Sequence, residues 1–192
     1  MSKDAVVPSR QRMRADARRN FDRIVAAAGA LVAEHGAEAS LEEIARRAEV
    51  GSATLHRHFP TRRALLEAVF EDRVKALCAR ADDLLTASDP GEALFTWLRA
   101  VGAHAAANRG LGASLMSGGD PALGRTCHEM IITAGEGLLA RARAADAVRP
   151  GIAVTHLLKL VGAISLATEQ EPDGPAEADR LLALAIDGVR PR

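Results

Sequence analysis

The sequence predicts an all-α protein of about nine helices. Aromatic residues make up only 3% of the 192 residues, tyrosine is absent, and alanine and leucine are abundant. Strands favour aromatic and β-branched side chains, whereas alanine and leucine are strong helix formers. Apolar residues recur at intervals of three and four, which is the spacing of one helix face, and no segment has the alternating pattern of a strand.

Caps and breakers divide the first 86 residues into four expected helices. Gly36 is a plausible stop for the first helix, and the Ser-x-x-Glu spacing at Ser40 has the form of a capping box for the second. Phe59-Pro60 ends the third, and Thr61 caps the fourth. The expected helices cover residues 16–35, 41–48, 52–58 and 61–86.

The second half continues with helices separated by glycine and proline. They are expected at residues 92–107, 111–117, 121–147, 152–168 and 176–189. We expect residues 1–16 to form a basic flexible arm, 17–63 a first helical domain, and 64–192 a second helical domain.

The net charge of zero hides two opposite halves. Residues 1–63 carry 12 basic and 8 acidic side chains, and residues 64–192 carry 13 and 17. Seven of the basic groups lie in the first 23 residues, against three acidic ones. A basic segment ahead of a helix is typical of phosphate binding, so the balanced total does not exclude a nucleic-acid partner.

Several classes of protein are disfavoured. Two cysteines imply neither a disulfide framework nor a cysteine-rich zinc site, and no apolar segment is long enough to span a membrane, so we expect a soluble cytoplasmic protein. The sequence lacks a G-x-S-x-G, a phosphate-binding G-x-x-x-x-G-K-[ST] and an H-E-x-x-H pattern. We therefore expect no enzymatic activity, no cofactor and no metal.

Two short helices joined by a tight turn and preceded by a longer helix predict a helix-turn-helix unit. The third helix must enter a DNA groove about 12 Å wide, so one face is apolar and the other is polar or basic. We expect Ala53 and Leu55 to face inward. The side chains left to reach DNA are Ser52, Thr54, His56, Arg57 and His58.

Residues 17–70 resemble the N-terminal domain of the tetracycline-repressor (TetR) family of bacterial regulators. The resemblance rests on the segments at 24–28, 40–45 and 54–66, in the family's order and spacing, with Gly36 between the first two. Two positions depart from the family pattern: Glu49 stands where a turn glycine is usual, and His56 where tyrosine is usual. A histidine can replace the phenol as a phosphate donor, with some dependence on pH.

The resemblance implies a regulator, most often a repressor, that binds a palindromic double-stranded operator as a homodimer. Carried over position by position, the implied DNA contacts are Arg18, Arg19, Ser40, Gly51, Ser52, Thr54, His56, Arg57, His58 and Arg62, with Arg14 as a further arm contact. It also implies dimerisation through the last two helices and release by a small-molecule inducer bound in the second half.

The effector itself is not identified by the sequence. Candidate pocket residues are Trp97, His104, Met116, Cys127, His128 and Met130, each of which could equally belong to the core or the surface. The alternative is a helical DNA-binding regulator without a small-molecule ligand, controlled by a protein partner or by abundance. A closed C-terminal half would favour that alternative, and a cavity of several hundred Å³ would favour the inducer.

Overall fold

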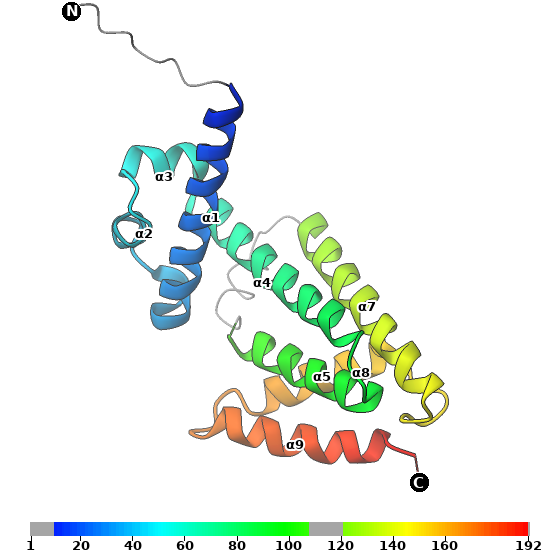
Figure 1. Ribbon diagram of the computed structural model, residues 1–192. Helices are drawn as coiled ribbons and strands as arrows, with labels where there is room; N and C mark the ends of the chain where they lie inside the picture. The colour runs from blue at the N-terminus through cyan, green and yellow to red at the C-terminus, as the bar shows by residue number, and fades with distance from the viewer. Residues whose placement is uncertain (1–9, 108–120, 192) are drawn as a thin grey trace, which may run out of the picture. The chain divides into compact units, whose positions relative to one another are not determined.

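A computed structural model describes residues 10–107 and 121–191, and within these ranges it contains only helices (Figure 1). The α-helices are α1 (Arg10–His35), α2 (Leu41–Arg47), α3 (Ser52–His58), α4 (Arg62–Leu84), α5 (Pro90–Ala107), α7 (Pro121–Ala144), α8 (Val154–Ala167) and α9 (Gly174–Val189), with one 3-10 turn at Gly36–Glu38. The all-α prediction is confirmed. The short helix expected at 111–117 lies outside the described residues.

The chain forms two compact units, residues 1–69 and 70–192, so that α4 begins in the first and ends in the second. In the first unit, α1 to α3 and the start of α4 share one apolar core. Its fully buried large side chains are Ile24, Leu31, Ile44, Leu55 and Leu65. Burying each of these stabilises the unit by roughly 1.5–3 kcal/mol. An ion pair ties α1 to α2, in which Arg47 donates to both carboxylate oxygens of Glu34 at 2.8 and 3.1 Å.

The start of α1 differs from the sequence prediction. The helix begins at Arg10 rather than at Asp16, so the second part of the expected flexible arm is helical. Residues 10–15 carry no apolar stripe, which is why periodicity missed them. They also contain no glycine or proline, and arginine, glutamine, methionine and alanine all favour helix.

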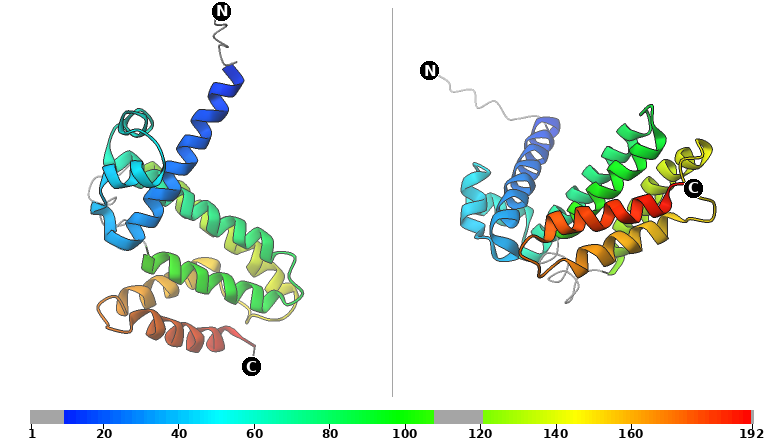
Figure 2. Two further views of the ribbon diagram at one scale, coloured as in Figure 1. Left: turned by 60° about the vertical axis from the view of Figure 1, so that its left-hand side comes forward. Right: turned by 90° about the horizontal axis from the view of Figure 1, so that it is seen from below.

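In the second unit α5 is the central helix, packed against α7, α8 and α9 (Figure 2). It buries residues on several sides, including Leu94, Phe95, Trp97, Leu98 and Val101. A helix buried on most of its circumference is largely apolar, and the two charged side chains of this one, Glu92 and Arg99, are exposed.

Close approach of α7 to α5 depends on a glycine. A Cβ atom on Gly135 would lie 2.8 Å from the Trp97 ring and 2.4 Å from Val154 Cγ2. The Trp97 indole is completely buried, and its Nε1 donates to the carbonyl of Leu77 at 3.1 Å. This hydrogen bond satisfies the one polar atom of the largest core side chain.

Candidate functional site

The turn between α2 and α3 fixes how the third helix leaves the second. The amide of Glu49 donates to Arg46 O at 3.1 Å, and that of Val50 donates to Ala45 O at 3.0 Å. These two bonds form a Schellman motif with Glu49 at the left-handed position, where φ is +53°. The usual family glycine therefore has a physical reason here, and Glu49 occupies a conformation that side chains with a Cβ disfavour.

One face of α3 packs on the first unit's core and the other is exposed. Leu55 is 1% exposed, as expected, but Ala53 is exposed and the prediction that it faces inward is wrong. Successive residues of a helix are 100° apart, so two residues separated by two positions lie 200° apart and cannot share a face. Ala53 is thus a surface residue that the sequence reasoning missed, and the helical angle alone would have found it.

The polar residues of α3 divide into two groups. Ser52, His56 and Arg57 are exposed, whereas Thr54 and His58 are half-buried. The ring of His58 lies edge-on to that of Phe21 in α1, with 6.3 Å between centroids. Histidine at 58 therefore contributes to packing between α1 and α3 as well as to the surface.

Ser40 and Arg62 hold the start of α2. The Ser40 hydroxyl accepts from the amide of Glu43 at 3.4 Å and donates to the carboxylate of Glu42 at 2.8 Å. Glu43 pairs with Arg46, so one half of the predicted capping box forms. The guanidinium of Arg62 is half-buried and donates to the carbonyl of Ala39 at 2.6 Å, which joins α4 to the segment before α2.

Two arginines of α1, Arg18 and Arg19, are exposed and pair with acidic residues of the same helix. Arg18 lies 3.1 Å from Asp22, with its side chain 77% exposed, and its guanidinium stacks over Phe21 at 6.0 Å. Arg19 pairs with Asp16. Such i,i+3 and i,i+4 pairs on a surface are worth only about 0.3–0.5 kcal/mol, so a phosphate could replace either carboxylate.

The candidate effector residues in the second unit are dispersed. Trp97 and Cys127 belong to the core, His128 is exposed, and Met116 lies outside the described residues. Met130 lines a hollow of about 420 Å³ between α4 and α7, together with Cys78, Asp82, Leu85, Thr126, Glu129, Thr133, Ala134 and Gly137.

His104 lies apart from this hollow, near the end of α5. Its ring packs on that of Phe70, with 5.9 Å between centroids. Burial and the charge of Arg73 lower the pKa of His104, and burial also lowers the pKa of Arg73. The Arg73 guanidinium contacts the carbonyl of Ala107 at 3.5 Å. Because the neutral imidazole is favoured, His104 can either donate or accept a hydrogen bond here.

An apolar surface lies on the outer side of α8 and α9. Leu166 and Leu184 are 72% and 69% exposed, and Leu160 is 40% exposed. Gly162 and Gly188 would meet no neighbouring atom if they carried a Cβ. Gly162 and Leu166 share one side of α8, and Leu184 and Gly188 share one side of α9, because residues four positions apart lie within 40° on a helix. We call the surface formed by these four residues the outer α8–α9 face; Leu160 lies on another side of α8.

Two negative findings concern the described part of the chain. No group of three His, Cys, Asp or Glu side chains there is arranged to hold a metal ion. None of the helices in that part combines the length and the apolar character required to cross a lipid bilayer.

The helix-turn-helix unit followed by a separate helical unit defines a class of protein, and sequence comparison agrees with it. Residues 24–69 match the family of bacterial regulatory proteins called the tetR family, and residues 89–191 match the C-terminal domain of SbtR-like transcriptional regulators. The chain belongs to the TetR family of transcriptional regulators, with an SbtR-like C-terminal domain.

Solved structures of TetR regulators extend this match over almost the whole chain. The regulator SCO0520 of Streptomyces coelicolor is 40% identical over 89% of this chain and 98% of its own, with a TM-score of 0.77. A regulator from Mycobacterium vanbaalenii is 35% identical over 93% and 99%, with a TM-score of 0.75. FadR of Bacillus subtilis, solved with stearoyl-CoA, shares the fold at 18% identity, covering 88% and 100%, with a TM-score of 0.59. A comparison with curated proteins finds no significant match.

Proposed function

We propose that this regulator is a repressor that binds a palindromic operator as a homodimer and is released by a small-molecule effector. DNA binding is supported by the exposed face of α3, on which Arg57 and His56 follow the small residues Ser52 and Ala53. In this proposal residues 17–63 bind DNA, and residues 64–192 bind the effector and the second subunit.

Small side chains at the start of α3 would let the helix enter the major groove closely. Gly51 and Ser52 begin the helix and are exposed, and a Cβ on Gly51 would meet nothing within 4 Å. Thr54 could reach a base edge or a phosphate through its hydroxyl, and the Ala53 methyl fits against a thymine methyl. Arg57 can fork onto a guanine edge or clamp a phosphate.

The remaining predicted contacts would position the duplex rather than read its sequence. Ser40, His56 and His58 would donate to phosphate oxygens. Arg62, whose guanidinium is held in place by its bond to Ala39 O, would contact a phosphate at a fixed position. Arg18 and Arg19 would exchange their helix carboxylates for phosphates.

The outer α8–α9 face supports dimerisation through the last two helices. Large exposed leucines next to glycines with open space provide apolar area and allow close helix approach. Two recognition helices are also what a palindrome requires, since its half-sites are about 34–36 Å apart or a multiple of this. Sedimentation of the protein at micromolar concentration tests the dimer.

The hollow between α4 and α7 supports a small-molecule effector over control by abundance alone. Its volume of about 420 Å³ falls in the range of roughly 300–1,000 Å³ that is usual for ligand sites. Its lining combines apolar groups such as Met130 and Leu85 with the hydroxyls of Thr126 and Thr133. The B. subtilis FadR structure with stearoyl-CoA shows that this fold can hold a ligand in at least one other protein.

The effector would act through α4, because this helix belongs to both units. A ligand can shift the positions of the recognition helices only if it binds two conformations with different affinities. The proposal is tested by isolating bound fragments from source DNA and screening small molecules against that complex. A compound that weakens operator binding while the dimer persists supports it. A stable dimer that no compound releases would favour control by a protein partner.

A further inference from the structure

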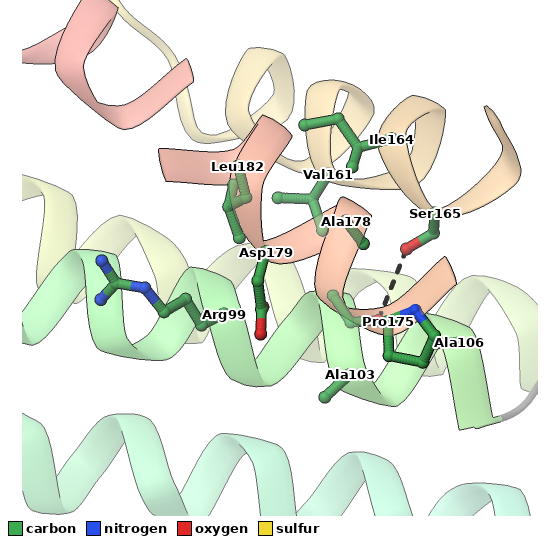
Figure 3. A pocket seen from close by; sticks show the side chains of 11 residues that line it. Arg99, Ala103, Ala106, Val161, Ile164, Ser165, Pro175, Ala178, Asp179 and Leu182 are labelled. Carbon is green, nitrogen blue, oxygen red and sulfur yellow. Dashed lines mark hydrogen bonds between the residues drawn. The ribbon is translucent and has the colours of Figure 1, made fainter. Parts of the chain in front are cut away.

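A second and more enclosed cavity lies where α5, α8 and α9 meet (Figure 3). Its volume is about 110 Å³, and it shares no lining residue with the hollow between α4 and α7. Gly102 of α5, Val161 of α8 and Leu182 of α9 form an apolar interior. Ser165, the one hydroxyl in the lining, already donates to the carbonyl of Gly102 at 3.4 Å. The interior therefore favours an uncharged, apolar group.

Opposite charges flank this cavity on two helices. Arg99 projects from α5 and Asp179 from α9, and both side chains are exposed (Figure 3). Neither takes part in an ion pair within the described part of the chain, although the adjacent Arg180 pairs with both Asp173 and Glu177. In Figure 3 Asp179 points toward α5, whereas the exposed Arg99 side chain extends along α5 away from Asp179 and must turn toward the cavity to bind a carboxylate there. After that turn, one donor for a carboxylate and one acceptor for an ammonium group flank the same apolar cavity.

The size of the cavity limits the apolar part of a ligand. An apolar cavity of about 150 Å³ holds benzene, so a cavity of about 110 Å³ suits a branched chain of about four carbons. We propose that this cavity binds a free aliphatic α-amino acid such as leucine or valine. The side chain enters between Gly102 and Leu182, the carboxylate binds Arg99, and the ammonium group binds Asp179. This site is independent of the effector site proposed above.

The test is calorimetric titration of the full-length protein with L-leucine. Binding at a dissociation constant of about 1 mM is expected for a ligand of this size. 4-Methylpentanoate lacks the ammonium group and 3-methylbutylamine lacks the carboxylate, and each should bind about tenfold more weakly. Arg99→Gln should weaken leucine binding by a similar factor and leave the binding of 3-methylbutylamine unchanged. Asp179→Asn should also weaken leucine binding and should leave the binding of 4-methylpentanoate unchanged.

Gly102→Ala tests occupancy of the cavity without endangering the fold. The added Cβ would lie 3.5 Å from Val161 Cγ1 and 4.0 Å from Leu182 Cδ2, which are ordinary contacts, so the protein stays folded while the cavity shrinks. Leucine affinity should fall while valine binding is retained. Gly29→Ala, which places a methyl on α1 at an ordinary 3.8 Å from Val69 Cγ1, is the matched control and should change neither.

Two results would overturn the proposal. One is the absence of saturable heat with leucine or valine up to about 50 mM, fifty times the expected dissociation constant. The other is leucine binding that Gly102→Ala, Arg99→Gln and Asp179→Asn all leave unchanged, which would place the amino acid elsewhere.

Discussion

Glu49 offers a test of how the turn before the recognition helix is built. With φ at +53° it occupies the left-handed position of a Schellman motif, a conformation that costs a residue with a Cβ about 1–2 kcal/mol. Replacing it by glycine removes this cost. Glycine also makes the unfolded chain more flexible, which costs about 0.4–1 kcal/mol of stability. A few tenths of a kcal/mol are lost with the exposed ion pair to Arg23, in which Arg23 Nη1 lies 3.6 Å from Glu49 Oε2. We expect Glu49→Gly to stabilise the protein by about 0.5 kcal/mol.

The same substitution should strengthen DNA binding, for a separate reason. The Glu49 carboxylate is 84% exposed two positions before the expected groove contacts at Gly51 and Ser52. Unit charges several ångströms apart in water interact by about 0.5–1 kcal/mol, which is about two- to fivefold in affinity. Glu49→Gln removes the charge and keeps the strained backbone, so it should raise affinity equally with no gain in stability. The affinity gain should shrink as salt rises.

Chemical denaturation and fluorescence anisotropy measure the two effects. Asp146 ends α7 in an equivalent motif, with φ at +51°, so Asp146→Gly is the matched backbone control. Aspartate tolerates this conformation better than glutamate, so Asp146→Gly should raise stability by less than Glu49→Gly does. It should leave the affinity for DNA unchanged. Equal stability of Glu49→Gly and Glu49→Gln would show that the left-handed backbone at position 49 is not strained. A DNA affinity that neither substitution raises would show that the Glu49 carboxylate does not repel DNA.

Three further predictions concern the second unit. Gly135→Ala should destabilise the protein by about 1–3 kcal/mol, because its methyl would overlap the Trp97 ring at 2.8 Å. Gly29→Ala, whose methyl would make an ordinary contact 3.8 Å from Val69 Cγ1, should be neutral or slightly stabilising in the same denaturation assay. Leu184→Glu places a charge on the outer α8–α9 face and should give a folded monomer in sedimentation experiments. A dimer that forms with unchanged affinity would show that the interface does not include Leu184. The pKa of His104 is lowered from its ordinary 6.5, so the folded state binds fewer protons than the unfolded state below that pH. The stability of the wild type should therefore decline as pH falls below about 6.5, and that of His104→Gln should decline less. If the melting temperatures of the wild type and of His104→Gln fall equally between pH 7 and 5, His104 does not contribute to the decline.

Much of the fold could be predicted from the sequence because its signals are local. The capping serine at 40 and the Phe59-Pro60 breaker placed α2 and α3 within a residue of their observed ends. Gly36, predicted to stop the first helix, has φ at +75°, as a helix-ending glycine often does. The start of α1 was missed because an exposed helical segment has no apolar periodicity to reveal it.

The candidate sites were harder to predict, because they depend on how distant helices meet. Trp97 has the chemistry of a ligand contact, yet its depth in the core and its bond to Leu77 O depend on the packing of α4 against α5. The cavity beside Gly102 is formed by three helices, with lining residues that run from Arg99 to Leu182, so no motif marks it. The exposure of Ala53, by contrast, could have been predicted from the sequence, because Ala53 lies 200° from the buried Leu55 around the helix axis.

We propose that the exposed face of α3 binds DNA through Arg57. This proposal is tested most directly by measuring the affinity of the wild type and of Arg57→Ala for a selected genomic duplex over a range of salt concentrations. Arg80→Ala, which removes another exposed arginine from α4, is the control and should behave like the wild type. We expect Arg57→Ala to bind more weakly, with the slope of log affinity against log salt reduced by about one. An unchanged affinity and an unchanged slope would contradict it.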